Sequence, residues 1–268
     1  MTELAVGPNG KALTFREMVL SPTFSPQQTK NFISNALLVM GKWPRSKPAQ
    51  VHDLVGEYLT EFLGEDTRLK LESENVCHRW FGQFADGLSL EKKICDSLPA
   101  ASREGTSLGI CHGDLHGDNV MVRDIGGKLI PFFIDFSRAG KTHSIKDLVI
   151  LESDMIIRGL TGIETLHDKA RISSFLESLD IKGGKSRLEK QGLSEDTLSR
   201  LEKIRVVTKE LRKNAFSFHG VAEIEYAGAA LLRTLEILSY GKLPRDENVR
   251  ATTYVSYLCE RIRRLSKV

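Results

Sequence analysis

Three oxygen-bearing side chains at short spacing are the part of this sequence that could do chemistry. Asp114 and Asn119 lie five residues apart in the segment His112-Gly-Asp-Leu-His-Gly-Asp-Asn119, and Asp135 follows an apolar run. Phosphoryl transfer needs oxygen ligands for a divalent metal ion and a carboxylate that orients the attacking hydroxyl. Magnesium accepts such hard ligands and leaves positions for phosphate and water. The pattern therefore predicts a phosphoryl-transfer site with Asp114 as the base and with Asn119 and Asp135 as metal ligands.

Short apolar strands would bring these side chains together. Three segments read as strands, namely residues 108–111, 119–123 and 129–134. The pair Gly126-Gly127 suits the turn between the second and the third. Because the chain reverses direction in such a hairpin, Asp135 should return beside Asn119. We therefore expect one loop, residues 112–119, and one strand end, residues 134–136, to form the site.

The rest of the chain reads mainly as helices. Apolar spacing and capping residues predict helices over residues 26–40, 51–63, 76–84, 88–98, 147–157, 166–179, 222–240 and 251–265, and one more that Ser194 caps. Residues 1–21 read instead as a short strand pair around Gly7-Pro-Asn-Gly10, because Asn-Gly suits a tight turn. We expect an α+β fold that is predominantly α, with residues 22–268 as its helical body.

The same residues resemble the aminoglycoside-phosphotransferase and choline-kinase branch of the protein-kinase-like superfamily. That branch carries H-x-D-x-x-x-x-N, then I-D-F or I-D-W, then an Asp-Leu that opens a helix. This sequence has His112 to Asn119, Ile134-Asp135-Phe136 and Asp147-Leu148. The resemblance implies a protein-kinase-like C-lobe, with Mg²⁺ and ATP as cofactors. It also implies a base at Asp114, metal ligands at Asn119 and Asp135, and a brace for the catalytic loop at Asp147.

One part of that family's site has no evident counterpart in the sequence. The family binds ATP between two lobes, and an N-lobe needs roughly 80 residues if its strands have about five or six residues each. Only about twenty residues precede the first expected helix, and Gly7-Pro-Asn-Gly-Lys11 lacks the spacing of a P-loop. We expect the N-lobe to be absent, reduced to residues 1–21, or supplied by a partner chain. A catalytically inactive kinase-like recognition or scaffold module is the alternative function.

Two segments carry narrower resemblances. The run from Gly140 to Glu152 is similar to kinase-like domains of bacterial conflict systems with STAND-type NTPases. The run Gly113-Asp-Leu-His-Gly117 also matches the first metal motif of calcineurin-like phosphoesterases, which use a two-metal centre. That chemistry needs a Gly-Asn-His downstream, and none occurs in the chain. The phosphoesterase interpretation is therefore weak.

The histidines of the loop have less specific roles. His112 is expected to hold the loop through backbone hydrogen bonds. His116 either holds the loop as well or contacts substrate or phosphate. Taken singly, Asp114 and Asn119 could be ordinary turn residues, since Asp and Asn fill turns everywhere. Their combination with Asp135 favours a site.

Composition excludes several other classes of protein. The net charge of +3 and the pI of about 8.6 are too mild to predict nucleic-acid binding. The chain has no apolar run of about 18 residues, and its four cysteines form no C-x-x-C pair. The N-terminus lacks the pattern of a signal peptide. We therefore expect a cytoplasmic protein with reduced thiols, whose partners are a nucleotide and an unknown hydroxyl acceptor rather than nucleic acid or a membrane.

Overall fold

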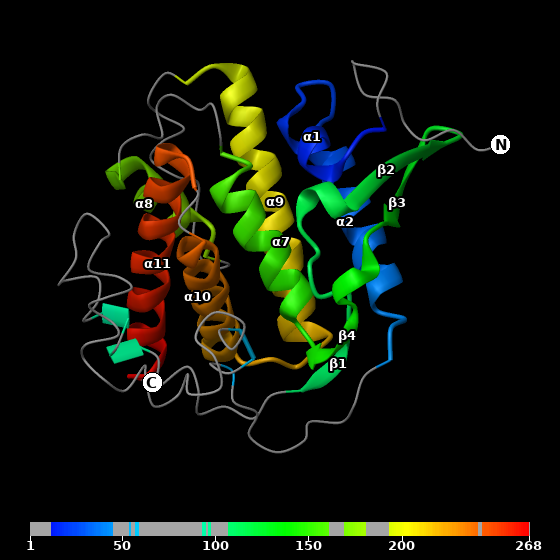
Figure 1. Ribbon diagram of the computed structural model, residues 1–268. Helices are drawn as coiled ribbons and strands as arrows, with labels where there is room; N and C mark the ends of the chain where they lie inside the picture. Colours follow the sequence, from blue (N-terminus) through cyan, green and yellow to red (C-terminus); the bar gives the residue numbers. More distant parts are fainter. Residues whose placement is uncertain are drawn as a thin grey trace.

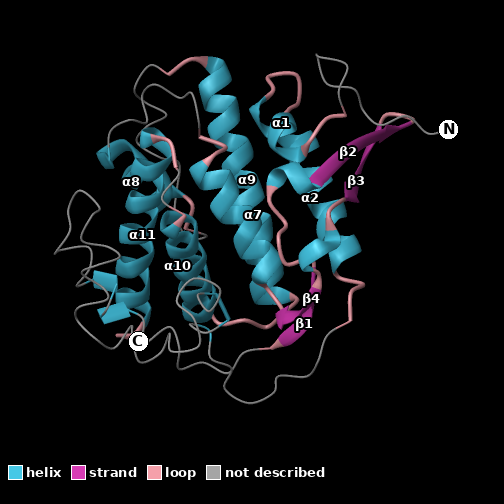
Figure 2. Cartoon of the chain, viewed as in Figure 1, coloured by secondary structure: helices cyan, strands magenta, loops and turns pink. Residues whose placement is uncertain are grey.

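The computed structural model describes residues 12–44, 54, 57–58, 93–94, 96–97, 107–160, 169–180, 193–240 and 243–267. The helices in these segments are α1 (Phe15–Leu20), α2 (Pro26–Met40), α7 (Lys146–Ile157), α8 (Lys169–Ser178), α9 (Glu195–Ser217), α10 (Glu223–Ser239) and α11 (Arg245–Leu265). The strands are β1 (Leu108–Cys111), β2 (Val120–Ile125), β3 (Lys128–Phe133) and β4 (Gly140–His143). The predicted α+β, predominantly α fold is confirmed (Figure 1, Figure 2).

Helix α7 is the centre of the helical body. It packs against α9, α10 and α11 (Figure 1). Every residue from Asp147 to Ile157 is buried, so the helix has no solvent-exposed face beyond its first residue. A helix that is buried all round belongs to the core of its domain. Because α7 also opens next to the predicted catalytic loop, it can join that loop to the bundle.

Two small antiparallel sheets lie beside the helices. In the first, β2 pairs with β3 from Val120 opposite Phe133 to Ile125 opposite Lys128, and Gly126 and Gly127 turn the chain with positive φ. The predicted hairpin is confirmed, with its strand bounds shifted by one or two residues. The second sheet pairs β1 with β4 and was not expected as a sheet. The sequence of β4, Gly-Lys-Thr-His, lacks the apolar alternation by which strands are recognised.

The segment before α2 differs from the prediction of an extended strand pair over residues 1–21. Phe15–Leu20 is a helix that begins with a capping box, in which the side chains of Thr14 and Glu17 each accept a hydrogen bond from the other's backbone N–H. This reciprocal capping satisfies donors that a strand would have paired elsewhere. Thr14 forms an isolated antiparallel bridge with Met121 of β2. The first arm of the expected pair lies outside the described residues.

Capping residues set the bounds of the long helices. Ser25 caps α2 together with Gln28, and the predicted cap of α9 at Ser194 is confirmed by its hydrogen bond from the backbone N–H of Thr197. Helix α11 begins at Arg245, six residues before the predicted start, because its charged first turn carries no apolar signal. The helix expected over residues 76–84 lies outside the described residues, as do most residues of the helices expected over 51–63 and 88–98. The described residues of these last two, 54, 57–58, 93–94 and 96–97, are helical.

Two further observations concern the apolar character of the helices and the cysteines. None of the described helices combines the length and the apolar character that crossing a bilayer requires. Cys111 and Cys259 are buried free thiols, as the sequence predicts for reduced cysteines. Cys77 and Cys95 lie outside the described residues.

Candidate active site

The predicted catalytic loop joins the two sheets. It leaves β1 after Cys111 and enters β2 at Val120, and its last three residues, Gly117–Asn119, form a turn of 3-10 helix. The backbone N–H of Asn119 donates to the carbonyl of His116 at 2.9 Å. The loop is thus a compact, internally bonded segment between two strands, and its shape depends on what holds its ends.

Asp147, in the first turn of α7, holds the beginning of the loop. Its carboxylate accepts hydrogen bonds from the backbone N–H of His112 at 2.7 Å and of Gly113 at 2.8 Å. The side chain is almost fully buried, and this burial raises the pKa of Asp147, while the two N–H groups oppose the rise. One carboxylate therefore satisfies two buried donors next to Asp114, in the position expected of a brace.

Only glycine fits at position 113. Its φ is +84°, and a Cβ atom there would lie 2.2 Å from the carbonyl oxygen of Arg138. Both the left-handed backbone and this close approach exclude a side chain. Gly113 therefore lets the loop turn tightly against the segment that follows β3, and this turn sets the backbone direction at Asp114.

Asp114 and Asn119 are joined across the loop. The side-chain amide of Asn119 donates to the backbone carbonyl of Asp114 at 2.9 Å. Asn119 is buried, whereas 29% of the Asp114 side chain is exposed, so the Asp114 carboxylate is the more accessible of the two groups. Nη2 of Arg233 lies 4.0 Å from Asp114 Oδ1, and Arg233 also bonds Glu236 at 2.6 Å. A buried guanidinium from α10 thus faces the predicted base.

Asp135 lies next to Asn119 because of the hairpin register. The backbone N–H of Ile134 donates to the carbonyl of Asn119 at 3.1 Å, so Asp135 is the next residue along the returning strand. Asp135 has φ 60° and is the only non-glycine residue with positive φ in the part of the chain that the structure describes. Such a conformation costs free energy and is concentrated at functional sites.

The Asp135 carboxylate is fully exposed and ionised. The side chain and backbone N–H of Ser137 donate to it, at 2.7 Å and 3.4 Å, and these hydrogen bonds lower the pKa of Asp135. A carboxylate that is held ionised at the surface is suited to bind a cation. The geometry brings it close to Asn119 and leaves it open to solvent.

The two histidines lie differently. His112 is fully buried, and its Nε2 donates to the carbonyl of Ile134 at 2.7 Å. This bond ties the start of the loop to the end of β3. His116 is half-buried, and its Nδ1 accepts from the backbone N–H of Asp118 at 3.3 Å. His116 therefore shapes the turn toward Asn119.

The donor set suits Mg²⁺ better than a softer metal. Asn119 supplies an amide oxygen and Asp135 a carboxylate, and magnesium typically takes one or two protein oxygens with phosphate and water. Among the described residues, no three His, Cys, Asp or Glu side chains lie close enough to hold a metal ion by themselves. An ion bound here would therefore complete its coordination with phosphate oxygens and water.

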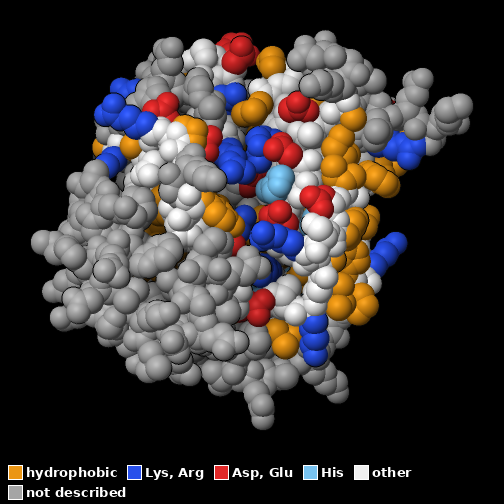
Figure 3. Space-filling model, viewed as in Figure 1, with side chains coloured by type: hydrophobic (Ala, Val, Ile, Leu, Met, Phe, Trp, Pro, Cys, Tyr) orange, Lys and Arg blue, Asp and Glu red, His pale blue; other side chains and the backbone are white. Residues whose placement is uncertain are grey.

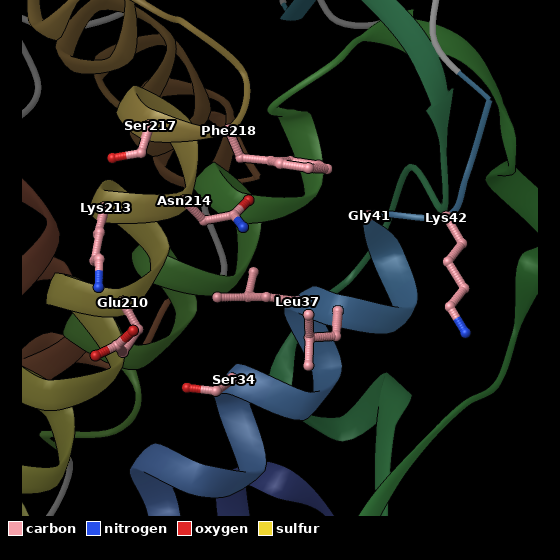
Figure 4. A pocket seen from close by; sticks show the side chains of 10 residues that line it. Ser34, Leu37, Gly41, Lys42, Glu210, Lys213, Asn214, Ser217 and Phe218 are labelled. Atoms are coloured by element: carbon pink, nitrogen blue, oxygen red, sulfur yellow. The ribbon is translucent and has the colours of Figure 1, made fainter.

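The surface around the site combines charged and apolar areas. Figure 3 shows acidic and basic side chains gathered around a histidine, with an apolar stripe beside them. The exposed apolar side chains here include Ile130 and Phe132 of β3, which alternate with less exposed residues along the strand, and Ile134, which follows the strand. A separate cavity of about 490 Å³ lies between α2 and α9, and no residue of the predicted catalytic loop lines it. Figure 4 shows the side chains that line this cavity.

Three residues near the site were missed by sequence reasoning. Asp154 and Arg16 contact the loop at Gly117 and Asp118, and Arg233 faces Asp114. Only Asp154 has a sequence signal, because it follows Asp147 by seven residues and so lies on the same face of the helix. The two arginines are far from the loop in sequence.

The loop, the hairpin and the central helix together define a kinase-like fold. The model of the phosphotransferase enzyme family (APH) matches residues 25–166, which is more than half of the chain and includes the whole of the loop. The chain therefore belongs to this family, and the family resemblance seen in the sequence is confirmed. No curated protein matches the chain.

A solved structure supports the same fold. The structure titled "Glucosamine kinase (crystal form B)" is similar, with a TM-score of 0.53 and 11% sequence identity. The similarity covers 93% of this chain and 60% of that chain. This chain thus spans about three fifths of the kinase it resembles. At this identity the likeness shows the fold alone.

Proposed function

We propose that this chain carries the phosphate-transfer part of an ATP-dependent phosphotransferase that acts on a hydroxyl acceptor. In this proposal Asp114 is the base, and Asn119 and Asp135 hold Mg²⁺, which neutralises phosphate charge when bound. The observation that carries the proposal is the convergence of these three residues. Asn119 bonds the Asp114 carbonyl with its side chain at 2.9 Å and the Ile134 N–H with its own carbonyl at 3.1 Å.

The role of Asp114 follows from its exposure. An acceptor hydroxyl that hydrogen-bonds to this carboxylate is oriented toward the phosphate, and the carboxylate takes the hydroxyl proton as the new O–P bond forms. Arg233 Nη2, 4.0 Å from Asp114 Oδ1, places a positive charge beside the group that faces the acceptor. The acceptor leaves as a phosphate ester, and ADP is the second product.

The apolar surface beside Asp135 suits the base of a nucleotide. Ile134 and Phe132 are exposed on the hairpin face next to this carboxylate. Among the described residues, no further sheet stands over that face. The proposal therefore includes a nucleotide-covering lobe that another segment or a partner chain contributes.

Calorimetric titration with ATP, with and without Mg²⁺, tests the proposal. We expect Mg²⁺-dependent binding, and we expect Asp135→Asn to weaken it by at least about tenfold, because an ionised ligand is lost. Asp114→Asn should leave nucleotide affinity nearly unchanged and lower turnover by about 10²–10⁴-fold. Asp124→Asn is the matched control, because this carboxylate lies at the tip of the same hairpin and bonds only the turn at Gly127 among the contacts identified.

Two results would contradict these assignments. If no Mg²⁺-dependent binding is found at millimolar ATP, the chain is better described as an inactive recognition or scaffold module. If Asp114→Asn abolishes nucleotide affinity instead of turnover, this residue is not the base. Turnover should be measured with a panel of hydroxylated acceptors, and glucosamine is a reasonable first member because a glucosamine kinase shares the fold.

A further inference from the structure

Helix α7 contacts the catalytic loop at two points. Asp147 and Asp154 are seven residues apart, which is about two helical turns, so their side chains lie on one face. Asp147 holds the N–H groups at the start of the loop, and Asp154 Oδ2 accepts from the backbone N–H of Gly117 at 2.8 Å. Asp114 lies between these two points. The helix therefore holds the loop by hydrogen bonds on both sides of the predicted base.

Arg16 of α1 adds to the second of these contacts, the one at Asp154. It binds Asp154 with two nitrogens, Nε at 3.2 Å and Nη2 at 2.7 Å, and binds Asp118 with the third at 2.5 Å. Paired hydrogen bonds between a guanidinium and a carboxylate fix direction as well as distance. A single arginine thus joins the central helix to the residue that precedes Asn119.

The two ion pairs of Arg16 differ in burial, and burial indicates which of them is stronger. The Asp154 side chain is 3% exposed and that of Arg16 is 16% exposed, whereas Asp118 is 44% exposed. An exposed pair contributes little, but a buried carboxylate that loses its cation is costly to keep. The bond between Arg16 and Asp154 therefore contributes most of the stabilisation of the loop, and the bond between Arg16 and Asp118 contributes less.

Arg16 is presented by a helix that is itself fixed. Phe15 of α1 stacks on Phe32 of α2 with ring centroids 5.1 Å apart. Lys203 of α9 donates to the carbonyl of Ser21 at 2.5 Å, just beyond the end of α1. A cation at that end of a helix is favourable. The short helix is thus anchored at both ends, which keeps Arg16 aimed at the loop.

The loop also approaches this pair without room for a side chain. A Cβ atom at Gly117 would lie 3.0 Å from Arg16 Cβ and 3.0 Å from Asp154 Oδ2. Two residues later comes Asn119, whose amide reaches back to Asp114. Any shift of Gly117 is therefore transmitted directly to the predicted metal ligand.

We propose that Arg16 and Asp154 are positioning residues that hold the metal-ligand end of the catalytic loop, a role that rests on the phosphotransferase function proposed above. In this role they act through the loop, by their bonds to Gly117 and Asp118. Their effect is to keep Asn119 at the distance from Asp135 that a shared cation needs. Residues that orient metal ligands in this indirect way typically change metal affinity or activity by about 10–100-fold when they are replaced.

The test compares Arg16→Gln with Arg158→Gln. Arg158 also bonds Asp154, at 3.3 Å, but it is 40% exposed and its second partner is Glu247, away from the loop. Arg16→Gln should raise the Mg²⁺ concentration for half-maximal nucleotide binding by at least about tenfold. It should also speed hydrogen–deuterium exchange of the loop amides. Arg158→Gln should change neither, and Arg16→Lys should restore part of the Mg²⁺ affinity because it keeps the charge.

The exchange measurement keeps this inference separate from the proposed function. Faster exchange at residues 112–119 in Arg16→Gln, and not in Arg158→Gln, supports the positioning role of Arg16 even if the wild-type chain binds no nucleotide. Equal exchange and equal Mg²⁺ dependence in the two glutamine variants overturn the inference, whatever the activity of the wild type. If Arg16→Gln does not fold, Asp154→Asn replaces it, with the same expected direction in both measurements.

Discussion

Replacing Arg212 by methionine is expected to lower the free energy of unfolding by about 3–5 kcal/mol, because it leaves a buried charge without its partner. Glu152 of α7 and Arg212 of α9 are both fully buried, and Nη2 of the arginine lies 2.7 Å from Oε1 of the glutamate. Nε donates to the same carboxylate at 3.1 Å. The hydroxyls of Tyr226 and Tyr254 donate to Glu152 at 2.6 Å and 2.7 Å.

The size of the effect comes from charge rather than from volume. Methionine fills most of the space of the arginine stem and adapts its shape, so little cavity remains. Burial and the charge of Glu152 raise the pKa values of Tyr226 and Tyr254, so both hydroxyls stay protonated and keep donating. Two neutral donors do not replace a cation inside the protein. The double variant Arg212→Met/Glu152→Gln removes both charges, and its cost should fall to about 1–3 kcal/mol for the imperfectly satisfied amide.

Urea-induced unfolding, followed by circular dichroism and analysed by linear extrapolation, measures these differences. The control is Arg263→Met, which removes an exposed ion pair with Glu260 and should cost no more than about 1 kcal/mol. The reasoning is refuted if Arg212→Met costs less than about 1 kcal/mol. It is also refuted if the double variant is less stable than the single one, because the buried charge would then not be the cause.

Two other substitutions test the start of the loop. Gly113→Ala should destabilise the protein and abolish turnover, because its Cβ would lie 2.2 Å from the Arg138 carbonyl oxygen. Gly127 also has positive φ but has open space around it, so Gly127→Ala should cost only the backbone strain of about 1 kcal/mol. Urea unfolding and turnover of both variants distinguish the two cases. Burial raises the pKa of Asp147 above its unfolded value of about 3.9, so the folded state binds the extra proton and stability falls as pH rises through the window between the two values. The stability difference between wild type and Asp147→Asn should therefore shrink with rising pH across that window, and a difference that grows instead would show that the hydrogen bonds to His112 and Gly113 outweigh burial.

The sequence predicted those parts of the site whose geometry is local. Asp114, Asn119 and Asp135 are connected by one loop and one hairpin, so residue types and a glycine turn were enough to bring them together. Strand β4 was missed because its side chains are polar. Helix α1 was missed because six residues are too few to show helical periodicity, although Thr14 and Glu17 carry the sequence pattern of a capping box. Arg16 was missed for a different reason. Periodicity identifies the face of a helix that is buried but not the segment, over a hundred residues away, that packs there.

Helix α7 links stability and function through separate faces. With about 100° of rotation per residue, Asp154 lies within about 20° of Asp147, whereas Glu152 lies about 140° away from it. The first two carboxylates face the loop, and the third faces the bundle, where it meets Arg212. Loss of Arg212 should therefore weaken the bundle and leave the protection of loop amides in the folded protein unchanged. Loss of Arg16 should instead speed hydrogen exchange of the loop amides in the folded protein, in addition to any cost in the free energy of unfolding. If both variants speed the exchange of the loop amides equally, α7 does not act as a rigid element. The contacts of Asp147 and Asp154 with the loop are then not independent of the core.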